Sequence, residues 1–295
     1  MIQNTNQAKA GGIPRLAMIN SFAGFGRCST TVALPVVSMM KVQACPVPTS
    51  VLSNHLGFPV CHFDDYTGQM QGYLHAWEQL GATFDGLYCG FLGSMEQIEI
   101  VRSFLESPMM KAENAKPLFL LDPVMGDNGK AYSTITPAHC EKMKELAALA
   151  DILTPNITEA CLLTDTPYKE GRFADYELTE ICRKLASRHA EATGKEAQSI
   201  VITGLLDHKR FLNYVWENGK RSVYATEIAG KSWHGTGDIF ASILAAGVLH
   251  EVPLMQSVQK AADFIALCIR GSEEAGVPEK DGVLFEIYLG RLLDM

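Results

Sequence analysis

Short apolar runs alternate with amphipathic segments along most of this chain. The apolar runs have the length and composition of buried strands, and the strands they predict cover residues 15–20, 43–47, 86–91, 117–121, 151–153 and 199–203. Helical spacing or a helix-start signal falls between them, and the predicted helices cover residues 29–40, 66–80, 94–105, 176–192, a segment from 136, and most of the chain from 239. Strands and helices that alternate in this way imply an α/β fold whose central, mainly parallel sheet carries helices on both faces.

One part of the chain departs from this alternation. Two apolar runs, residues 211–216 and 222–228, flank the dipeptide Asn218-Gly219. Asn-Gly favours the tight turn of a β-hairpin. We therefore expect a small hairpin at one edge of the sheet.

The start of the chain has a different character from the rest. Residues 1–12 are mainly polar and hold no apolar core segment, so they predict a loose tail rather than a signal peptide. No linker and no internal repeat divides the remaining sequence. The pattern therefore predicts a single domain over residues 13–295.

Composition narrows the classes of function. The formal net charge of −8 and the absence of Lys or Arg runs argue against a nucleic-acid partner. The 8 cysteines are scattered without a C-x-x-C pair, which is typical of reduced thiols in a cytosolic protein. No apolar run reaches the roughly 20 residues of a membrane span. We expect a cytoplasmic protein with neither nucleic acid nor membrane among its partners.

Polar and glycine-rich signals come directly after several predicted strands. They are Gly90 to Ser94, Asp122 to Asp127, Thr154 to Asn156 with Glu159, and the pair Thr203-Gly204. The carboxyl ends of parallel strands face one shared cleft in an open sheet. The scattered acids and glycines therefore predict one site.

The sequence Gly235-Thr236-Gly237-Asp238 precedes a long apolar stretch. The free N–H groups at a helix start hold anions, and Asp238 beside them offers a proton acceptor, a combination that suits phosphoryl transfer. The same residues are also compatible with a simple turn and helix cap.

The acidic motifs also have two interpretations. Asn156 and Glu159 have the spacing of a helix capping box. Asp122, followed by Pro, is compatible with an ordinary turn, whereas its spacing to Asp127 around Gly126 favours a cation or phosphate site.

Together these motifs resemble those of the ribokinase-like superfamily and, within it, the pyridoxal kinases. The residues that carry the resemblance are the Gly235 to Asp238 motif, the DPVxGD-like segment Asp122 to Asp127, the TPNxxE-like segment Thr154 to Glu159, and Ser53-Asn54-His55 after Pro48-Thr49. The resemblance extends from Leu16 over nearly the whole chain. It implies a three-layer α/β/α kinase domain, and its members commonly form homodimers.

The resemblance also implies a role for each matched residue. Asp238 would be the base for the 5′-hydroxymethyl group of a vitamin B6 vitamer, while Gly235, Thr236 and Gly237 hold the transferring phosphate. The residues implied at ATP are Asp122, Asp127, Asn156, Glu159, Thr203 and Gly204, with Asp122 and Glu159 as ligands of Mg²⁺. A monovalent cation, K⁺ or Na⁺, is also implied. Residues 128–134, which begin after Asp127, resemble a mobile flap over the nucleotide.

Recognition of the pyridine ring follows the family pattern less closely. Ser21 and Thr49 are implied to hydrogen-bond the ring. Phe91 stands where the family often has Tyr, so it stacks on a ring without donating a hydrogen bond. The glycine-rich residues 24–27 also differ from the animal enzymes.

Three other functions stay open at this point. Hydroxymethylpyrimidine kinases usually carry a different pattern at the Gly235 to Asp238 motif, and sugar kinases carry an early lid that residues 43–64 do not show. A non-catalytic protein that binds a B6 vitamer has no use for a base at Asp238. The prediction is therefore an ATP-dependent vitamin B6 kinase.

Overall fold

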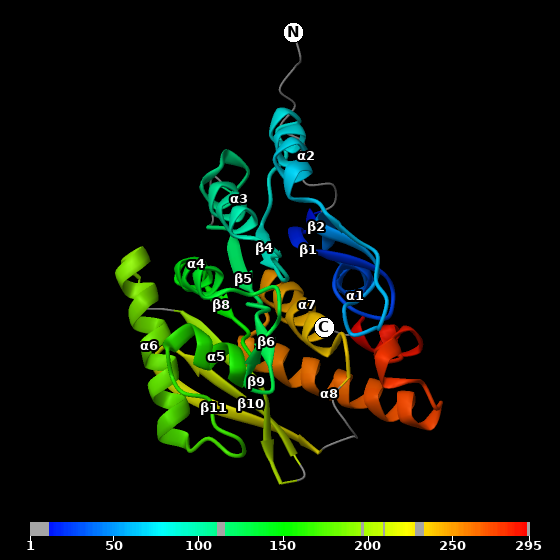
Figure 1. Cartoon of the computed structure of the whole chain (residues 1–295), viewed down its shortest axis with the longest axis vertical. Helices are drawn as coiled ribbons and strands as arrows, with labels where there is room; N and C mark the ends of the chain where they lie inside the picture. Colours follow the sequence, from blue (N-terminus) through cyan, green and yellow to red (C-terminus); the bar gives the residue numbers. More distant parts are fainter. Residues whose placement is uncertain (1–11, 111–115, 196–197, 209, 228–232, 294–295) are drawn as a thin grey trace.

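A computed structural model describes residues 12–110, 116–195, 198–208, 210–227 and 233–293 of the chain. Its main sheet has nine strands in the order β11-β10-β9-β8-β5-β4-β1-β2-β3 (Figure 1). These strands are β1 (Arg15–Phe25), β2 (Gln43–Asn54), β3 (Phe63–Asp65), β4 (Gly86–Cys89), β5 (Leu118–Leu121), β8 (Ile152–Leu153), β9 (Ser199–Asp207), β10 (Arg210–Glu217) and β11 (Lys220–Glu227). The strands β6 (Gly126–Asp127) and β7 (Lys130–Ala131) form a separate small hairpin.

The strands pair as the alternating sequence predicts. Every pair from β2 through β1, β4, β5 and β8 to β9 is parallel. The strands β10 and β11 add an antiparallel hairpin at one edge. Its turn is Asn218-Gly219, and both residues have positive φ, 51° and 72°, as a tight type I′ turn requires. The predicted edge hairpin is confirmed as far as Glu227; Ile228 lies outside the described residues.

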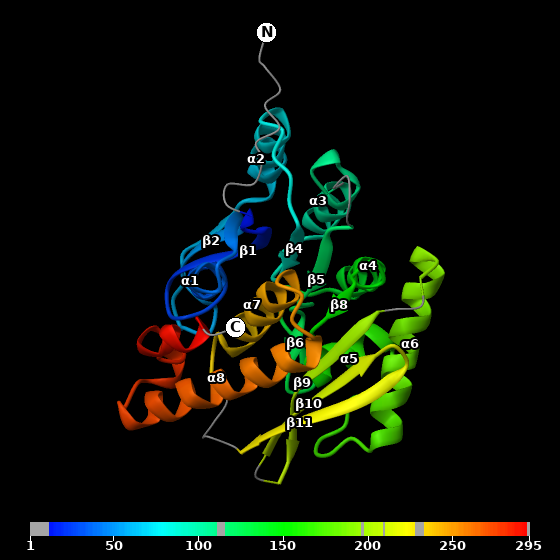
Figure 2. The same ribbon diagram turned by 180° about the vertical axis from the view of Figure 1, so that it is seen from behind.

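Helices cover both faces of the sheet (Figure 2). The helices are α1 (Thr30–Met39), α2 (Thr67–Gln79), α3 (Met95–Glu106), α4 (Pro137–Ala147), α5 (Ile157–Thr164), α6 (Asp175–Thr193), α7 (Thr236–Leu249) and α8 (Leu254–Glu274). Short 3₁₀ segments cover residues 108–110, 279–281 and 286–292. The helices α1, α7 and α8 pack on one face and α2 to α6 on the other, so two separate hydrophobic cores form. The three-layer α/β/α architecture is therefore confirmed.

The first two strands are longer than the apolar runs suggest. The pairing of β1 with β2 continues past Asn20, with Phe22 opposite Val51 and Phe25 opposite Asn54. Phe22 is exposed and Ala23 buried, so this extension has the alternating pattern of a strand with one solvent face. The short strand β3, absent from the sequence-based prediction, pairs antiparallel with β2.

The ends of the chain add little to this picture. The tail predicted at residues 1–12 lies, apart from Gly12, outside the described residues. Among the helices in the described ranges, none combines the length and apolar character needed to cross a bilayer.

Candidate active site

A large hollow, which we call the central hollow, opens at the carboxyl ends of the parallel strands. Its volume is about 1760 Å³. It brings together all but one of the residues to which the family resemblance assigns a role, namely Ser21, Phe91, Asp122, Asp127, Asn156, Glu159, Thr203, Gly204, Gly235, Thr236, Gly237 and Asp238. The carboxyl ends of the parallel strands thus bring together residues that are far apart in the sequence.

Thr49 is the exception. Its side chain is fully buried, and its hydroxyl donates to the carbonyl oxygen of Phe91 at 2.9 Å. Its own carbonyl accepts from Gln97 Nε2 at 2.8 Å. Thr49 does not line the central hollow, so the structure does not show the ring contact that the family resemblance implies for it. In this geometry Thr49 supports the loop that carries Phe91.

The helix α7 begins at Gly235 without a side-chain cap. Gly235 has φ of 79°, and a Cβ atom at this position would lie 2.0 Å from the carbonyl oxygen of Arg27. Only glycine fits both constraints. Gly235, Thr236 and Gly237 line the central hollow. The first N–H groups of a helix lack intrahelical partners, so an anion bound here would satisfy them and meet the positive end of the helix dipole.

The carboxylate of Asp238 is held by donors from three elements. Its Oδ1 accepts from Asn20 Nδ2 at 3.0 Å and from the Tyr88 hydroxyl at 3.4 Å. Its Oδ2 accepts from the backbone N–H of Ser29 at 2.6 Å. Burial raises the pKa of Asp238, and the three donors oppose that rise. The side chain therefore has a fixed direction at the edge of the anion-binding turn.

The orientation of the Asn20 side-chain amide follows from its other contacts. The Asn20 Oδ1 accepts from the backbone N–H of Ser21 at 2.8 Å and of Phe91 at 3.0 Å. Since the oxygen faces these two donors, the Nδ2 group faces Asp238. Gly90 presses against the same amide, because a Cβ at Gly90 would lie 2.6 Å from Asn20 Nδ2.

Two buried acids, Asp122 and Glu159, also line the central hollow. Burial and the nearby charge of Asp238 raise the pKa of Asp122 to about 8. Burial and the charge of Asp122 raise the pKa of Glu159 well above its ordinary value. A buried carboxyl group whose pKa is raised by a neighbouring negative charge would be stabilised in its ionised form by a nearby cation.

Glu159 also has a structural role. Its Oε2 accepts from the backbone N–H of Asn156 at 2.8 Å, and Asn156 Oδ1 accepts from the Glu159 N–H at 2.9 Å. This reciprocal pair is the capping box that the sequence predicts at the start of α5. The other oxygen, Oε1, accepts from Met125 N–H at 3.1 Å. Within the described ranges no group of three or more His, Cys, Asp or Glu side chains has the arrangement of a metal site.

The hairpin of β6 and β7 lies where the flap was predicted. Its turn residues Asn128 and Gly129 both have positive φ. The Gly129 N–H donates to Thr158 Oγ1 at 2.9 Å, and a Cβ at Gly129 would lie 2.4 Å from the Tyr168 ring. The hairpin is therefore seated on α5 and on the segment that follows it. Asp127 lines the central hollow and is exposed.

Phe91, His55 and His234 also line the central hollow. The imidazole rings of His55 and His234 pack with their centroids 4.2 Å apart. His55 Nδ1 accepts from Gly57 N–H at 3.1 Å, so its Nε2, 2.7 Å from the Lys280 carbonyl oxygen, is the protonated nitrogen. These two contacts fix the orientation of the His55 ring at the edge of the hollow.

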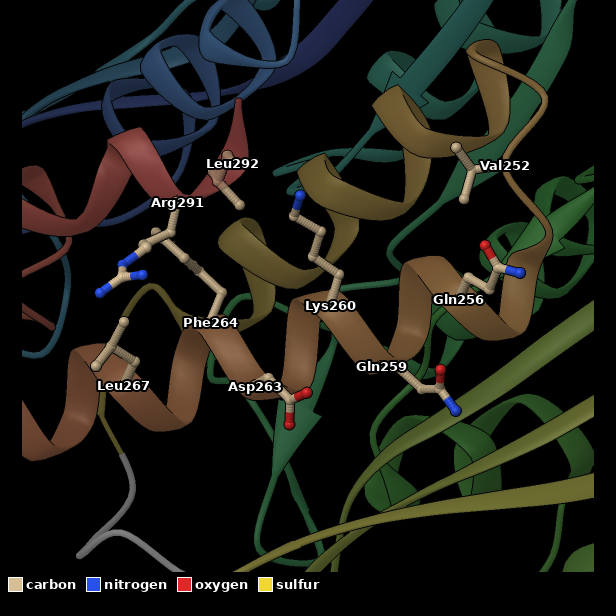
Figure 3. A pocket seen from close by; sticks show the side chains of 9 residues that line it. All are labelled: Val252, Gln256, Gln259, Lys260, Asp263, Phe264, Leu267, Arg291 and Leu292. Carbon is tan, nitrogen blue, oxygen red and sulfur yellow. The ribbon is translucent and has the colours of Figure 1, made fainter. Parts of the chain in front are cut away.

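A second hollow lies on the outer side of α8 (Figure 3). Its volume is about 780 Å³, and its lining residues are Val252, Gln256, Gln259, Lys260, Asp263, Phe264, Leu267, Arg291 and Leu292. The opposite side of α8 lines the central hollow through Ala262, Ile265, Ala266 and Ile269. The second hollow shares no lining residue with the central one and contains none of the residues predicted for the site.

Comparison with known proteins identifies the family. The model of the phosphomethylpyrimidine kinase family matches residues 79–282. The chain belongs to this family. The match includes the acidic loops, the flap and the start of α7, which together form most of the central hollow.

Individual members of the family and of the fold agree with this assignment. A candidate phosphomethylpyrimidine kinase from Bacteroides thetaiotaomicron is 32% identical, with a TM-score of 0.89 over 97% of this chain and 96% of that one. Another crystal form of that protein contains pyridoxal, at 30% identity over 96% of each chain. The hydroxymethylpyrimidine/phosphomethylpyrimidine kinase of Aquifex aeolicus is 26% identical over 90% of this chain and 92% of its own length.

A fold match extends to the pyridoxal kinases. The enzyme of Leishmania donovani in complex with ADP and pyridoxamine has a TM-score of 0.82 at 21% identity, over 95% of this chain and 96% of that one. These findings show a ribokinase-like small-molecule kinase of the phosphomethylpyrimidine kinase family.

Sequence reasoning missed two residues of this kinase site, Asn20 and Tyr88. Asn20 is the last residue of the apolar run 15–20, and Asp122 comes directly after the apolar run 117–121. Both are therefore polar residues at the end of a predicted strand. Tyr88 lies inside a buried strand, where an aromatic residue is usually core material. Its only signal is chemical, since a buried tyrosine hydroxyl needs a hydrogen-bond partner.

Proposed function

We propose that this protein transfers the γ-phosphoryl group of ATP to the 5′-hydroxymethyl group of a vitamin B6 vitamer. The observation that carries the proposal is the position of Asp238, a carboxylate held by three donors at the uncapped start of α7. A base and an anion site thus lie side by side in one hollow. That pairing suits transfer of a phosphoryl group to an alcohol.

The chemistry follows from how phosphoryl transfer proceeds. Its transition state is loose and spreads negative charge over three equatorial oxygens, so alignment and charge stabilisation dominate catalysis. The N–H groups of Gly235, Thr236 and Gly237 supply that stabilisation. Asp238 orients the alcohol and accepts its proton. The hairpin at 126–131 excludes water above the nucleotide.

Mg²⁺ is the metal that the buried acids fit best. Burial raises the pKa of both Asp122 and Glu159, with further contributions from Asp238 at Asp122 and from Asp122 at Glu159. Mg²⁺ in kinases is commonly held by one or two carboxylates together with substrate phosphates. Because both Glu159 oxygens already accept backbone N–H groups, we assign the direct contact to Asp122 and a water-mediated one to Glu159. When bound, the metal would neutralise phosphate charge. A monovalent cation and a homodimer remain predictions from the family resemblance.

The vitamer would occupy the part of the central hollow that Phe91 and Ser21 line. Phe91 offers a face for a pyridine ring, and the Ser21 hydroxyl offers a hydrogen bond. Crystals of the Bacteroides relative with pyridoxal support this choice of substrate. The family model and the Aquifex relative support the second candidate, hydroxymethylpyrimidine.

The deciding experiment is coupled measurement of ADP release with Mg-ATP and four alcohols, namely pyridoxal, pyridoxamine, pyridoxine and hydroxymethylpyrimidine. We expect the highest kcat/KM with one of the three B6 vitamers. Turnover of hydroxymethylpyrimidine alone would establish the second candidate instead. Vitamer binding in calorimetry without any ADP release would indicate a non-catalytic binding protein.

A further inference from the structure

The two oxygens of Asp238 have different environments. Oδ1 accepts two hydrogen bonds, from the Asn20 amide at 3.0 Å and from the Tyr88 hydroxyl at 3.4 Å. Oδ2 accepts one, from the Ser29 N–H at 2.6 Å. A carboxylate oxygen has two lone-pair positions, so Oδ1 is saturated and Oδ2 keeps one position open.

We propose that Oδ2 of Asp238 accepts the proton of the substrate alcohol, and that Tyr88 and Asn20 are positioning residues that reserve this oxygen for the reaction. In the step, the alcohol oxygen bonds to the γ-phosphorus of ATP while its proton moves to Oδ2. The bond from phosphorus to the bridging oxygen breaks, and ADP leaves with the electron pair. The proton on Asp238 then passes to water. This inference rests on the proposed kinase activity.

Tyr88 acts in this arrangement only as a donor. It is the penultimate residue of β4, its side chain is fully buried, and its ring belongs to the core beneath α1 and α7. Burial and the negative charges of Asp238 and Asp122 raise the pKa of Tyr88 well above its ordinary value. The hydroxyl therefore keeps its proton and directs it at Oδ1.

Asn20 is fixed as firmly. Two backbone N–H groups, of Ser21 and Phe91, hold its oxygen, which leaves the Nδ2 group directed at Asp238. The amide is 1% exposed, so water does not compete for these bonds. One side chain thus connects β1, the loop after β4 and the start of α7.

The third donor comes from a strained backbone position. Ser29 has φ of 55° and ψ of −140°, a conformation that L-residues other than glycine rarely adopt. This conformation accompanies the short bond from its N–H to Oδ2. Strain of this kind persists where the surrounding structure fixes it, often at catalytic centres.

The test compares Tyr88→Phe with Tyr73→Phe. Tyr73 is a matched control, because its hydroxyl also donates one hydrogen bond, to the Pro46 carbonyl oxygen at 3.2 Å, and it does not line the central hollow. We expect Tyr88→Phe to lower kcat about tenfold, since a hydrogen bond to a charged group is lost. KM for ATP and for the vitamer should stay within about twofold, and Tyr73→Phe should keep wild-type kcat.

A double variant separates positioning from general stability. In the Asp238→Asn background we expect Tyr88→Phe to cause no further loss of kcat, because both changes act on one carboxylate. A further tenfold loss there would overturn the proposal. So would wild-type kcat in the single Tyr88→Phe variant.

Asn20→Asp covers the case in which Tyr88→Phe does not fold. It preserves the side-chain volume and the two backbone contacts but replaces the donor to Oδ1 with a second carboxylate oxygen. Because this oxygen repels Asp238, we expect a loss of kcat larger than that of Tyr88→Phe. Unchanged kcat in Asn20→Asp would also overturn the proposal. A wild-type protein without turnover would overturn the proposed function, whereas an active wild type with active Tyr88 and Asn20 variants overturns this inference alone.

Discussion

The centre around Asp238 and the hairpin of β6 and β7 border the same hollow but are built in opposite ways. Asp238 accepts hydrogen bonds from residues on β1, on β4 and beside α1, and two of those residues, Asn20 and Tyr88, are almost entirely buried. The hairpin has strands of two residues, and Asp127 and Asn128 within it are exposed. The proposed base is thus held by the packed frame, whereas the hairpin proposed as a flap is held by a few local contacts.

The largest effect should come from Asp238→Asn, which breaks the centre directly. The amide keeps the side-chain volume but cannot accept the alcohol proton. We expect kcat to fall roughly a hundredfold or more, with the fold and ADP binding retained. Single-turnover kinetics and calorimetry check this. Near-normal kcat would remove Asp238 from the role of base.

Gly235→Ala should displace the anion-binding turn without touching the base. The new Cβ would lie 2.0 Å from the Arg27 carbonyl oxygen, and φ at this position is 79°. We expect kcat to fall by about tenfold to a hundredfold, because the N–H groups no longer point at the phosphate. Gly81→Ala is the control, since Gly81 has φ of 68° but its Cβ would meet no atom within 4 Å. Equal losses in both variants would indicate backbone strain alone.

Gly129→Ala should affect the hairpin more than the centre. Its Cβ would lie 2.4 Å from the Tyr168 ring, so the turn must lift from its seat. We expect KM for ATP to rise severalfold and ADP release without vitamer to increase, while kcat changes less. Gly194→Ala, at another left-handed glycine with nothing within 4 Å, should leave KM unchanged. A drop in kcat with KM unchanged would contradict the division between the two regions.

The smallest effect concerns the stability contributed by Asp122, which lines the same hollow. Its pKa is about 8 in the folded protein against 3.8 ordinarily, so the folded state binds the extra proton between these values. The stabilising contribution of Asp122 to the free energy of unfolding is therefore fully present below about pH 4, and it is lost as pH rises towards 8. Over this pH range we expect the melting temperature of the Asp122→Asn variant to fall by a few degrees less than that of the wild type. Parallel curves for the two proteins would count against the shifted pKa.

The architecture was largely predictable because apolar patterning and turn chemistry are local signals. The capping box at Asn156 and the turn at Asn218-Gly219 are confirmed, since each depends on residues next to one another in the chain. The convergence of strand-end residues was predictable for a different reason, because parallel topology alone brings them to one edge.

The parts that sequence could not supply depend on contacts between distant segments. Thr49 was assigned to the ring, yet its hydroxyl bonds the Phe91 carbonyl, a pairing that no local pattern specifies. In the sequence Tyr88 is one more apolar residue of a buried strand. Its hydrogen bond to Asp238, 150 positions away, becomes visible only in the folded structure. The length of β1 depends on its partner β2, and so it exceeded the apolar run.

The approach of Gly90 to the Asn20 amide has an evolutionary consequence. Because a methyl group at position 90 would lie 2.6 Å from Asn20 Nδ2, a larger residue there is tolerated only after position 20 has become smaller or has turned away. The two sites are expected to mutate as a pair in divergent lineages. A lineage that enlarges residue 90 before residue 20 has changed passes through a protein whose Asp238 carboxylate is misdirected. Selection would remove that protein.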